Sequence, residues 1–457
     1  MNMAKMLLYI DPGTGAMLFS VLMGIVSAAF FLLQKVVLKA KFLLSGGKVK
    51  KETENRIPYV IFSDSKRYWN VFEPICDVFE ARGIACEYWT ASPDDPALDK
   101  AYAHVKTRFI GEGNKAYAVL NLMNADICLA TTPGLDVYQW KRSKNTRFYV
   151  HIVHEIGEVL MYRMFGTDYF DAVLLSGEFQ KEGIRKLEDI RKLDQKELVV
   201  VGSTYMDSMM KRRKDEVYAE CAATIQPEDN QCEKKAVGTH SEDRIPTVLV
   251  APTWGVSSIL NLYGERFLQA VVDTGYRVIV RPHPQSFISD PDLMEQLRQK
   301  FPEGDRFEWN RDNDNFDVLN RADIMISDFS GVVFDFSIIF DKPILYTNTG
   351  LDLAPYDAAW MDAPIWRKEV LPRLGEELNE LDFDNLKSVI DQLLSDEVYQ
   401  KGRDYVRDTA WQYRGESAER VVDYLVHKHE CICGDEAGKN AKNMKTYDKT
   451  VGDDLVC

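Results

Sequence analysis

The stretch ADIMISDFSGVVFDFSIIFDKPILY, residues 322–346, decides the fold of this chain. Residues 322–327 form a short apolar run typical of a buried strand, and residues 332–340 form an apolar helical segment. The turn Asp-Phe-Ser-Gly joins the two, and residues 343–346 supply another strand. The order strand, helix, strand predicts a βαβ unit with parallel strands.

The turn of this unit is a candidate anion site. We expect Ser330 at the helix N-cap and Gly331 where the backbone can approach a ligand closely. The first N–H groups of a helix lack partners within the helix, and here they point out of the carboxyl edge of the sheet, where open parallel sheets bind ligands. The alternative is a buried helix start, capped by its own serine, that binds nothing.

Strands and helices alternate in two series, which predicts two Rossmann-like domains, each with a doubly wound parallel sheet, facing a central cleft. The echo between ADICLATTPG (125–134) and ADIMISDFSG (322–331) agrees with two domains of similar build, although chance similarity between two such strands explains it equally well. The predicted segments are an N-terminal segment (1–34), a basic juxtamembrane linker (35–56), an N-terminal Rossmann-like domain (57–225), a polar linker (226–244), a C-terminal Rossmann-like domain (245–428) and a tail (429–457).

Residues 15–33 are uncharged and mostly apolar, and a helix of this length nearly spans a bilayer core of roughly 30 Å. Six lysines follow this run between residues 35 and 51, whereas only Lys5 precedes it. This asymmetry predicts a single-pass transmembrane helix in the cell membrane with the catalytic body in the cytoplasm. The alternative is a helix that lies in the membrane interface with the lysines on anionic headgroups.

The formal net charge of −15 argues against a nucleic-acid partner. Eight cysteines occur without regular spacing, so we interpret most of them as reduced, buried thiols. Near the C-terminus, His427, His429, Cys431 and Cys433 alternate with other residues, but they lack the usual two-residue gap between cysteine ligands. We therefore predict no metal and no cofactor, and a frayed helix end at this position.

A second candidate site is RPHP, residues 281–284, at the end of an apolar strand. Arg281 and His283 lie two residues apart, so an extended chain projects both to one side, at the same sheet edge as the Ser330 turn. A guanidinium matches phosphate oxygens, and an imidazolium can donate to an anion or protonate a leaving oxygen. Thr253 and Trp254, after the strand at residues 247–251, belong to the same edge by topology.

Two histidines stand out in the N-terminal half, in FYVHIVHEIGE. His151 lies inside a strand and fits a buried core position, whereas His154 follows the strand and is the better-placed general base. Glu155 or Glu158 could hold the tautomer of its ring. A base placed opposite an anion site suggests transfer of a phosphorylated group to a hydroxyl.

The order of APTW (251–254), RPHP (281–284) and SDFSGVVFDF (327–336) after a histidine segment resembles the CDP-glycerol glycerophosphotransferases, which include teichoic acid polymerases and primases. The resemblance implies a GT-B-like fold and transfer of glycerol phosphate from CDP-glycerol, with release of CMP. It implies that His154 is the base and that Arg281 and His283 contact the donor phosphate. The turn that cradles the pyrophosphate corresponds to Ser327, Asp328, Ser330 and Gly331. The family usually has Trp-His-Gly at its first histidine, where this chain has Val153-His154-Glu155.

The expected function is transfer of glycerol phosphate, or a related polyol phosphate, from a CDP-polyol donor to a hydroxyl of a lipid-linked or wall-polymer acceptor. CMP is a good leaving group, so no metal is expected in this reaction. The rival enzyme is a GT-B glycosyltransferase that uses a nucleotide sugar. A membrane-anchored nucleotide-binding protein without catalysis is the third hypothesis, favoured by the altered residues around His154.

Overall fold

The computed structural model describes residues 56–224, 244–312, 314–362, 365–395 and 397–440. The predicted membrane helix at 15–33, nearly all of the basic linker at 35–56 and all but the last residue of the polar linker at 226–244 lie outside these residues. Among the described helices, none combines the length and the apolar character that crossing a bilayer requires.

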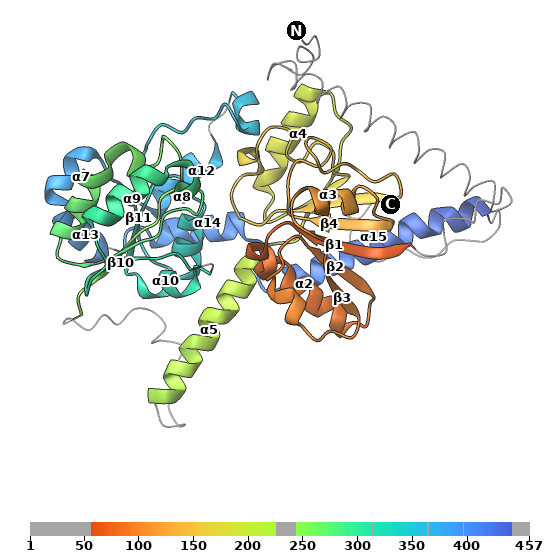
Figure 1. Ribbon diagram of the computed structural model, residues 1–457, viewed down its shortest axis with the longest axis horizontal. Helices are drawn as coiled ribbons and strands as arrows, with labels where there is room; N and C mark the ends of the chain where they lie inside the picture. Colours follow the sequence, from red (N-terminus) through yellow and green to blue (C-terminus); the bar gives the residue numbers. More distant parts are fainter. Residues whose placement is uncertain (1–55, 225–243, 313, 363–364, 396, 441–457) are drawn as a thin grey trace, which may run out of the picture. The chain divides into compact units, whose positions relative to one another are not determined.

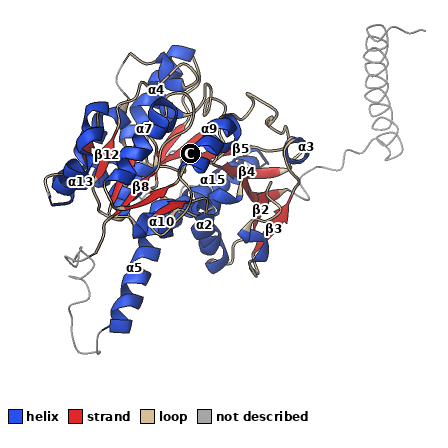
Figure 2. Cartoon of the chain, turned by 60° about the vertical axis from the view of Figure 1, so that its left-hand side comes forward, coloured by secondary structure: helices blue, strands red, loops and turns tan. Residues whose placement is uncertain are grey.

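The first domain is built on a seven-stranded parallel sheet with the strand order β3-β2-β1-β4-β5-β6-β7. Its strands are β1 (Ile57–Ser63), β2 (Cys86–Thr90), β3 (Val105–Phe109), β4 (Ala125–Ala130), β5 (Phe148–Ile152), β6 (Ala172–Leu175) and β7 (Glu197–Val200). The helical segments between and after them are η2 (Lys66–Tyr68), α2 (Trp69–Ala81), η3 (Pro96–Asp99), α3 (Asn114–Leu120), η4 (Val159–Met161), α4 (Phe179–Arg191) and α5 (Thr204–Thr224). Apolar clusters fill both faces of this sheet, as expected for parallel strands covered by helices (Figure 2).

The second domain contains a six-stranded parallel sheet with the order β10-β9-β8-β11-β12-β13. Its strands are β8 (Thr247–Val250), β9 (Arg277–Val280), β10 (Phe307–Trp309), β11 (Ile324–Ser327), β12 (Ile344–Tyr346) and β13 (Gly375–Glu377). The early helices are α7 (Ile259–Asp273), α8 (Ser286–Ser289), α9 (Pro291–Lys300), α10 (Phe316–Arg321), α11 (Val332–Phe334) and the π-helical turn η5 (Asp335–Ile339). The later ones are η6 (Asp357–Trp360), α12 (Trp366–Leu374), η7 (Glu380–Asn385), α13 (Leu386–Ser395), α14 (Gln400–Ala410) and α15 (Ser417–Asn440).

Both sheets share the strand order of the Rossmann fold. In this fold the first three strands extend the sheet in one direction, and the strands from the fourth onward extend it in the other, so the switch point lies between the first and fourth strands. The reversal falls between β1 and β4 in the first domain and between β8 and β11 in the second. The two segments with the repeated Ala-Asp-Ile motif are β4 and β11, so they hold equivalent positions. The prediction of two parallel-sheet α/β domains is confirmed.

The C-terminal helix departs from the expected division of the chain, in which residues up to 428 belong to the second domain and 429–457 form a tail. Instead, α15 runs to Asn440 and packs on α2, α5 and β4 of the first domain (Figure 1). Its apolar side chains Val421, Val422 and Leu425 are fully buried in the first domain's core, so the chain returns to the domain with which it began.

Candidate functional site

A pocket of about 210 Å³ lies at the carboxyl edges of β8, β9 and β11. These three strands are neighbours at the switch point of the second sheet, where open α/β sheets bind ligands. Arg281, His283 and Ser330 line the pocket together, as their positions after β9 and β11 predict. Arg67 and Asn70 reach it from the first domain, so both domains contribute to one site.

The guanidinium of Arg281 is held in place by the protein itself. It donates to the side-chain oxygen of Asn310 and, over 2.8 Å, to the carbonyl oxygen of Asp312. Burial lowers its pKa, and the nearby carboxylates of Asp312 and Asp314 oppose that shift. Both hydrogen-bond acceptors are neutral oxygens, so a fixed positive charge faces the pocket, as an anion site requires.

His283 is neutral at physiological pH, which differs from the expected imidazolium. Burial lowers its pKa to about 4, and the charge of Arg67 adds to the effect. The backbone N–H of Gln285 donates to Nδ1 over 3.1 Å, so in the neutral ring the proton is on Nε2. His283 is therefore prepared to donate a hydrogen bond from Nε2.

Ser327 and Asp328 do not face the pocket. Both are fully buried: the Ser327 hydroxyl donates to the Ala251 carbonyl over 2.7 Å, and the Asp328 carboxylate accepts from the N–H groups of Thr253 and Ile259. Burial raises the pKa of Asp328 to about 6, and these N–H donors oppose the shift. These two residues tie the loop after β8 to the turn after β11 and so fix the pocket wall from behind.

The turn itself differs from the expected capped helix start. Ser330 lines the pocket, but the N-cap position belongs to Gly331, and no side chain caps it. Gly331 has an ordinary φ of −60°, so no unusual backbone angle requires glycine here. A Cβ at this position would overlap the Glu155 carboxylate. The group that approaches the Gly331 backbone closely is therefore the side chain of Glu155, which belongs to the first domain.

Glu155 is in turn held by Arg367 of α12, which donates to it over 3.3 Å and to the Phe329 carbonyl over 2.8 Å. Glu158 accepts from the Arg367 backbone N–H. The two glutamates thus bind this buried arginine, and the expectation that one of them holds the His154 ring is wrong. Glu155 thus brings the histidine segment next to the turn.

Thr253 and Trp254 lie at the predicted edge and are half-buried. The Thr253 backbone is committed to Asp328, and the Trp254 ring centre lies 6.3 Å from that of His283. Their place beside the pocket agrees with the topology, and direct contact with a substrate stays a prediction for both.

His154 follows β5 and is not among the residues that line the pocket. Its ring packs between those of Tyr68 and Tyr162, and Nδ1 lies 3.0 Å from the Thr131 hydroxyl. That hydroxyl donates its only proton to the Ile152 carbonyl, so it accepts from His154, and Nε2 of the neutral ring is left as an acceptor. Burial lowers the pKa of His154, and the charges of Glu155 and Asp64 oppose the shift. The tautomer of His154 suits a general base.

His151 is fully buried in the core, as its position inside the strand predicts.

Arg67, the first-domain cation of the site, is not among the residues predicted from the sequence. Arg67 follows β1 by four residues, and its charge lowers the pKa of both His154 and His283. It therefore lies close enough to both rings to act on them through its field. The rule that ligands bind at the carboxyl edge applies equally to β1, and it would have singled out this arginine.

Comparison with known proteins agrees with the two-domain fold. The structure is similar to that of the wall teichoic acid polymerase TagF, solved as a histidine-to-asparagine variant with CDPG, with a TM-score of 0.52 and 15% identity over 88% of this chain and 98% of that one. A second TagF structure, from a longer soak, gives a TM-score of 0.50 at 15% identity over 89% and 98%. No curated protein sequence matches the chain significantly. The model of the CDP-Glycerol:Poly(glycerophosphate) glycerophosphotransferase family matches residues 140–427, which is well over half of the sequence. The match includes every second-domain residue of the candidate site, and the chain belongs to that family.

Proposed function

We propose that this transferase moves glycerol phosphate, or a related polyol phosphate, from a CDP-activated donor to a hydroxyl of a wall-polymer or lipid-linked acceptor. The observation that carries the proposal is the convergence of Arg281, the Nε2–H of His283 and Arg67 on one pocket at the sheet's switch point. Two guanidinium groups and a neutral donor suit a diphosphate. Family membership independently supports glycerophosphate transfer.

In the proposed step, the acceptor oxygen attacks the β-phosphorus of the donor. A new P–O bond forms to the acceptor, the P–O bond to the CMP oxygen breaks, and CMP leaves. The acceptor's proton passes to Nε2 of His154, while Arg281 and His283 stabilise the charge that develops on the phosphates. Such a reaction depends on positioning and charge stabilisation more than on covalent catalysis.

The acceptor and the site of action are part of the proposal. A membrane helix at residues 15–33, followed by the lysines of residues 35–51, would hold the catalytic body at the cytoplasmic side of the membrane. Tethering raises the local concentration of an acceptor that is itself bound to lipid or polymer.

The test measures CMP or UDP release and acceptor labelling by the purified protein with CDP-glycerol, CDP-ribitol and a panel of UDP-sugars. We expect turnover with a CDP-polyol. Turnover with UDP-sugars alone would establish the rival glycosyltransferase, and donor binding without turnover on any acceptor would establish a binding protein.

Arg281→Lys and His283→Gln link the activity to this pocket. Removing a charge-assisted hydrogen bond costs about 1.5–3 kcal/mol, so we expect kcat/KM for the donor to fall roughly 10- to 150-fold. Arg277→Lys, at the opposite end of β9, and His104→Gln, an exposed histidine, serve as matched controls that keep full activity.

A further inference from the structure

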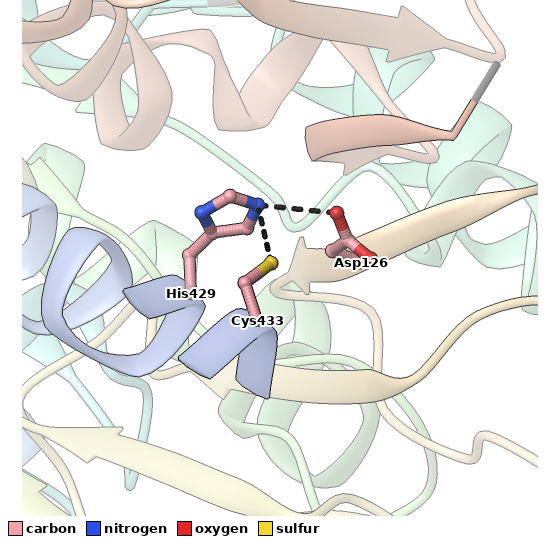
Figure 3. A group of neighbouring side chains, drawn as sticks. All are labelled: Asp126, His429 and Cys433. Atoms are coloured by element: carbon pink, nitrogen blue, oxygen red, sulfur yellow. Dashed lines mark hydrogen bonds and ion pairs between the residues drawn. The ribbon is translucent and has the colours of Figure 1, made fainter. Parts of the chain in front are cut away.

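Three side chains that can bind a metal meet at the amino end of β4, away from the carboxyl edge that carries the proposed active site. Asp126 is the second residue of β4, and His429 and Cys433 lie one helical turn apart on α15 (Figure 3). Their ligand atoms all lie within 4.8 Å of one another.

The helix separates the four histidines and cysteines that alternate in the sequence. Residues four apart share a helix face, whereas residues two apart do not. His429 and Cys433 therefore face Asp126, while His427 and Cys431 form a second pair, with Cys431 Sγ 3.6 Å from His427 Nε2. Cys431 is disulfide-bonded, an exception to the expected reduced thiols, whereas Cys433 is not part of a disulfide.

Two of the three separations between the ligand atoms match a tetrahedral centre. The Asp126 Oδ2 atom lies 3.1 Å from His429 Nε2, which lies 3.5 Å from Cys433 Sγ (Figure 3). With metal–ligand distances of about 2.0–2.3 Å, tetrahedral zinc separates O from N by about 3.4 Å and N from S by about 3.5 Å. The third separation, between the Asp126 oxygen and Cys433 Sγ, is no more than 4.8 Å, and these two atoms would approach each other to about 3.5 Å around a bound ion.

The surroundings also suit a divalent cation. An aspartate and a thiolate together balance two positive charges. Arg147 lies 3.3 Å from Oδ1 of Asp126 and so orients the carboxylate with Oδ2 toward His429, as partners outside the ligand shell do in metal sites. The Tyr59 ring packs against the imidazole at 5.0 Å between ring centres and covers one side of the site.

We propose that Asp126, His429 and Cys433 bind one zinc ion, with water as the fourth ligand, and that this ion fixes α15 to the first domain's sheet. The ion would lie at the amino end of β4, whereas the proposed active site lies at the carboxyl edge of the strands, so its role is structural. The proposal is independent of the proposed function and replaces the expectation that the chain carries no metal.

The test begins with elemental analysis of the full-length protein, purified under reducing conditions without added metal, and with titration of the metal-free protein with Zn²⁺ and Co²⁺. We expect about one zinc per chain. Cobalt should give a thiolate charge-transfer band, which requires Cys433 in the ligand shell. Removal of the metal with a chelator should lower the melting temperature.

His429→Ala and Cys433→Ser should abolish both the stoichiometric zinc and the cobalt band. His427→Ala and Cys431→Ser, the equally spaced pair on the other face of the same helix, should retain both. The proposal is overturned if the wild type takes up no stoichiometric Zn²⁺, or if the metal stays in Cys433→Ser or is lost from His427→Ala. Because the cobalt titration uses the wild type, the test does not depend on whether a variant folds.

Discussion

The contact between Gly331 and Glu155 gives a prediction whose size follows from the structure. Gly331 has φ of −60°, so Gly331→Ala places no strain on the backbone, and by itself the change should stabilise the fold by about 0.4–1 kcal/mol through the unfolded chain. The new methyl group, however, overlaps the Glu155 carboxylate. Overpacking costs about 1–3 kcal/mol, so the overlap outweighs the gain. We expect a net destabilisation of about 1–2 kcal/mol.

The second variant isolates the cause. In a Glu155→Ala background the carboxylate is gone, so Gly331→Ala should become neutral or mildly stabilising. The coupling energy between the two substitutions should therefore exceed about 1 kcal/mol. Gly304→Ala is the matched control, because a Cβ there meets nothing within 4 Å and the expected effect is independent of Glu155.

The assay is urea unfolding of the four proteins of the cycle, together with donor KM for each. If Gly331→Ala costs the same free energy with and without Glu155, the overlap is not the cause. A donor KM that rises in both backgrounds while stability is unchanged would show instead that glycine is needed for the approach of a ligand, as the sequence pattern suggests.

Three further predictions concern charge and protonation. Arg67→Ala should lower kcat/KM for the donor roughly 10- to 150-fold, with Arg67→Lys retaining part of the activity, and unchanged kinetics in steady-state assays would remove this arginine from the site. Asp328→Ala leaves two backbone N–H groups without their acceptor, so stability should fall by about 2–5 kcal/mol in urea unfolding, and a loss below about 1 kcal/mol would contradict the structural role. Burial lowers the pKa of His151 from 6.5 to about 3. Between these two pH values the unfolded chain binds a proton at this histidine and the folded chain does not, so the free energy of unfolding falls as the pH drops from 6.5 toward 3. At pH 5 the loss amounts to about 2 kcal/mol relative to pH 7, and His151→Gln should remove that part of the pH dependence of unfolding.

Much of the fold could be predicted because each element carries its own periodic signal. The strand expected at residues 247–251 is β8, Thr247–Val250, and the strand expected at residues 343–346 is β12, Ile344–Tyr346. Parallel strands then bring their carboxyl ends to one edge, which is why Arg281, His283 and Ser330 could be assigned to one pocket from their places in the sequence alone.

The remaining features depend on contacts between segments that are far apart in the sequence. Whether Asp328 points into the pocket or behind it depends on the N–H groups of Thr253 and Ile259, which lie 75 and 69 residues away. The position of α15 depends in part on ion pairs such as that between Arg82 and Asp423. Local periodicity shows that such a helix is amphipathic but not which core it covers.

The return of α15 to the first sheet has a consequence for dissecting the protein. A fragment that stops in the segment between the two sheets lacks Val421, Val422 and Leu425, and it exposes the apolar surface that they cover. Such a fragment should aggregate when expressed alone and become soluble when a peptide spanning Ser417–Asn440 is supplied separately. The first domain is thus compact in space but divided along the gene by the second, so it cannot be exchanged between relatives as a single uninterrupted segment.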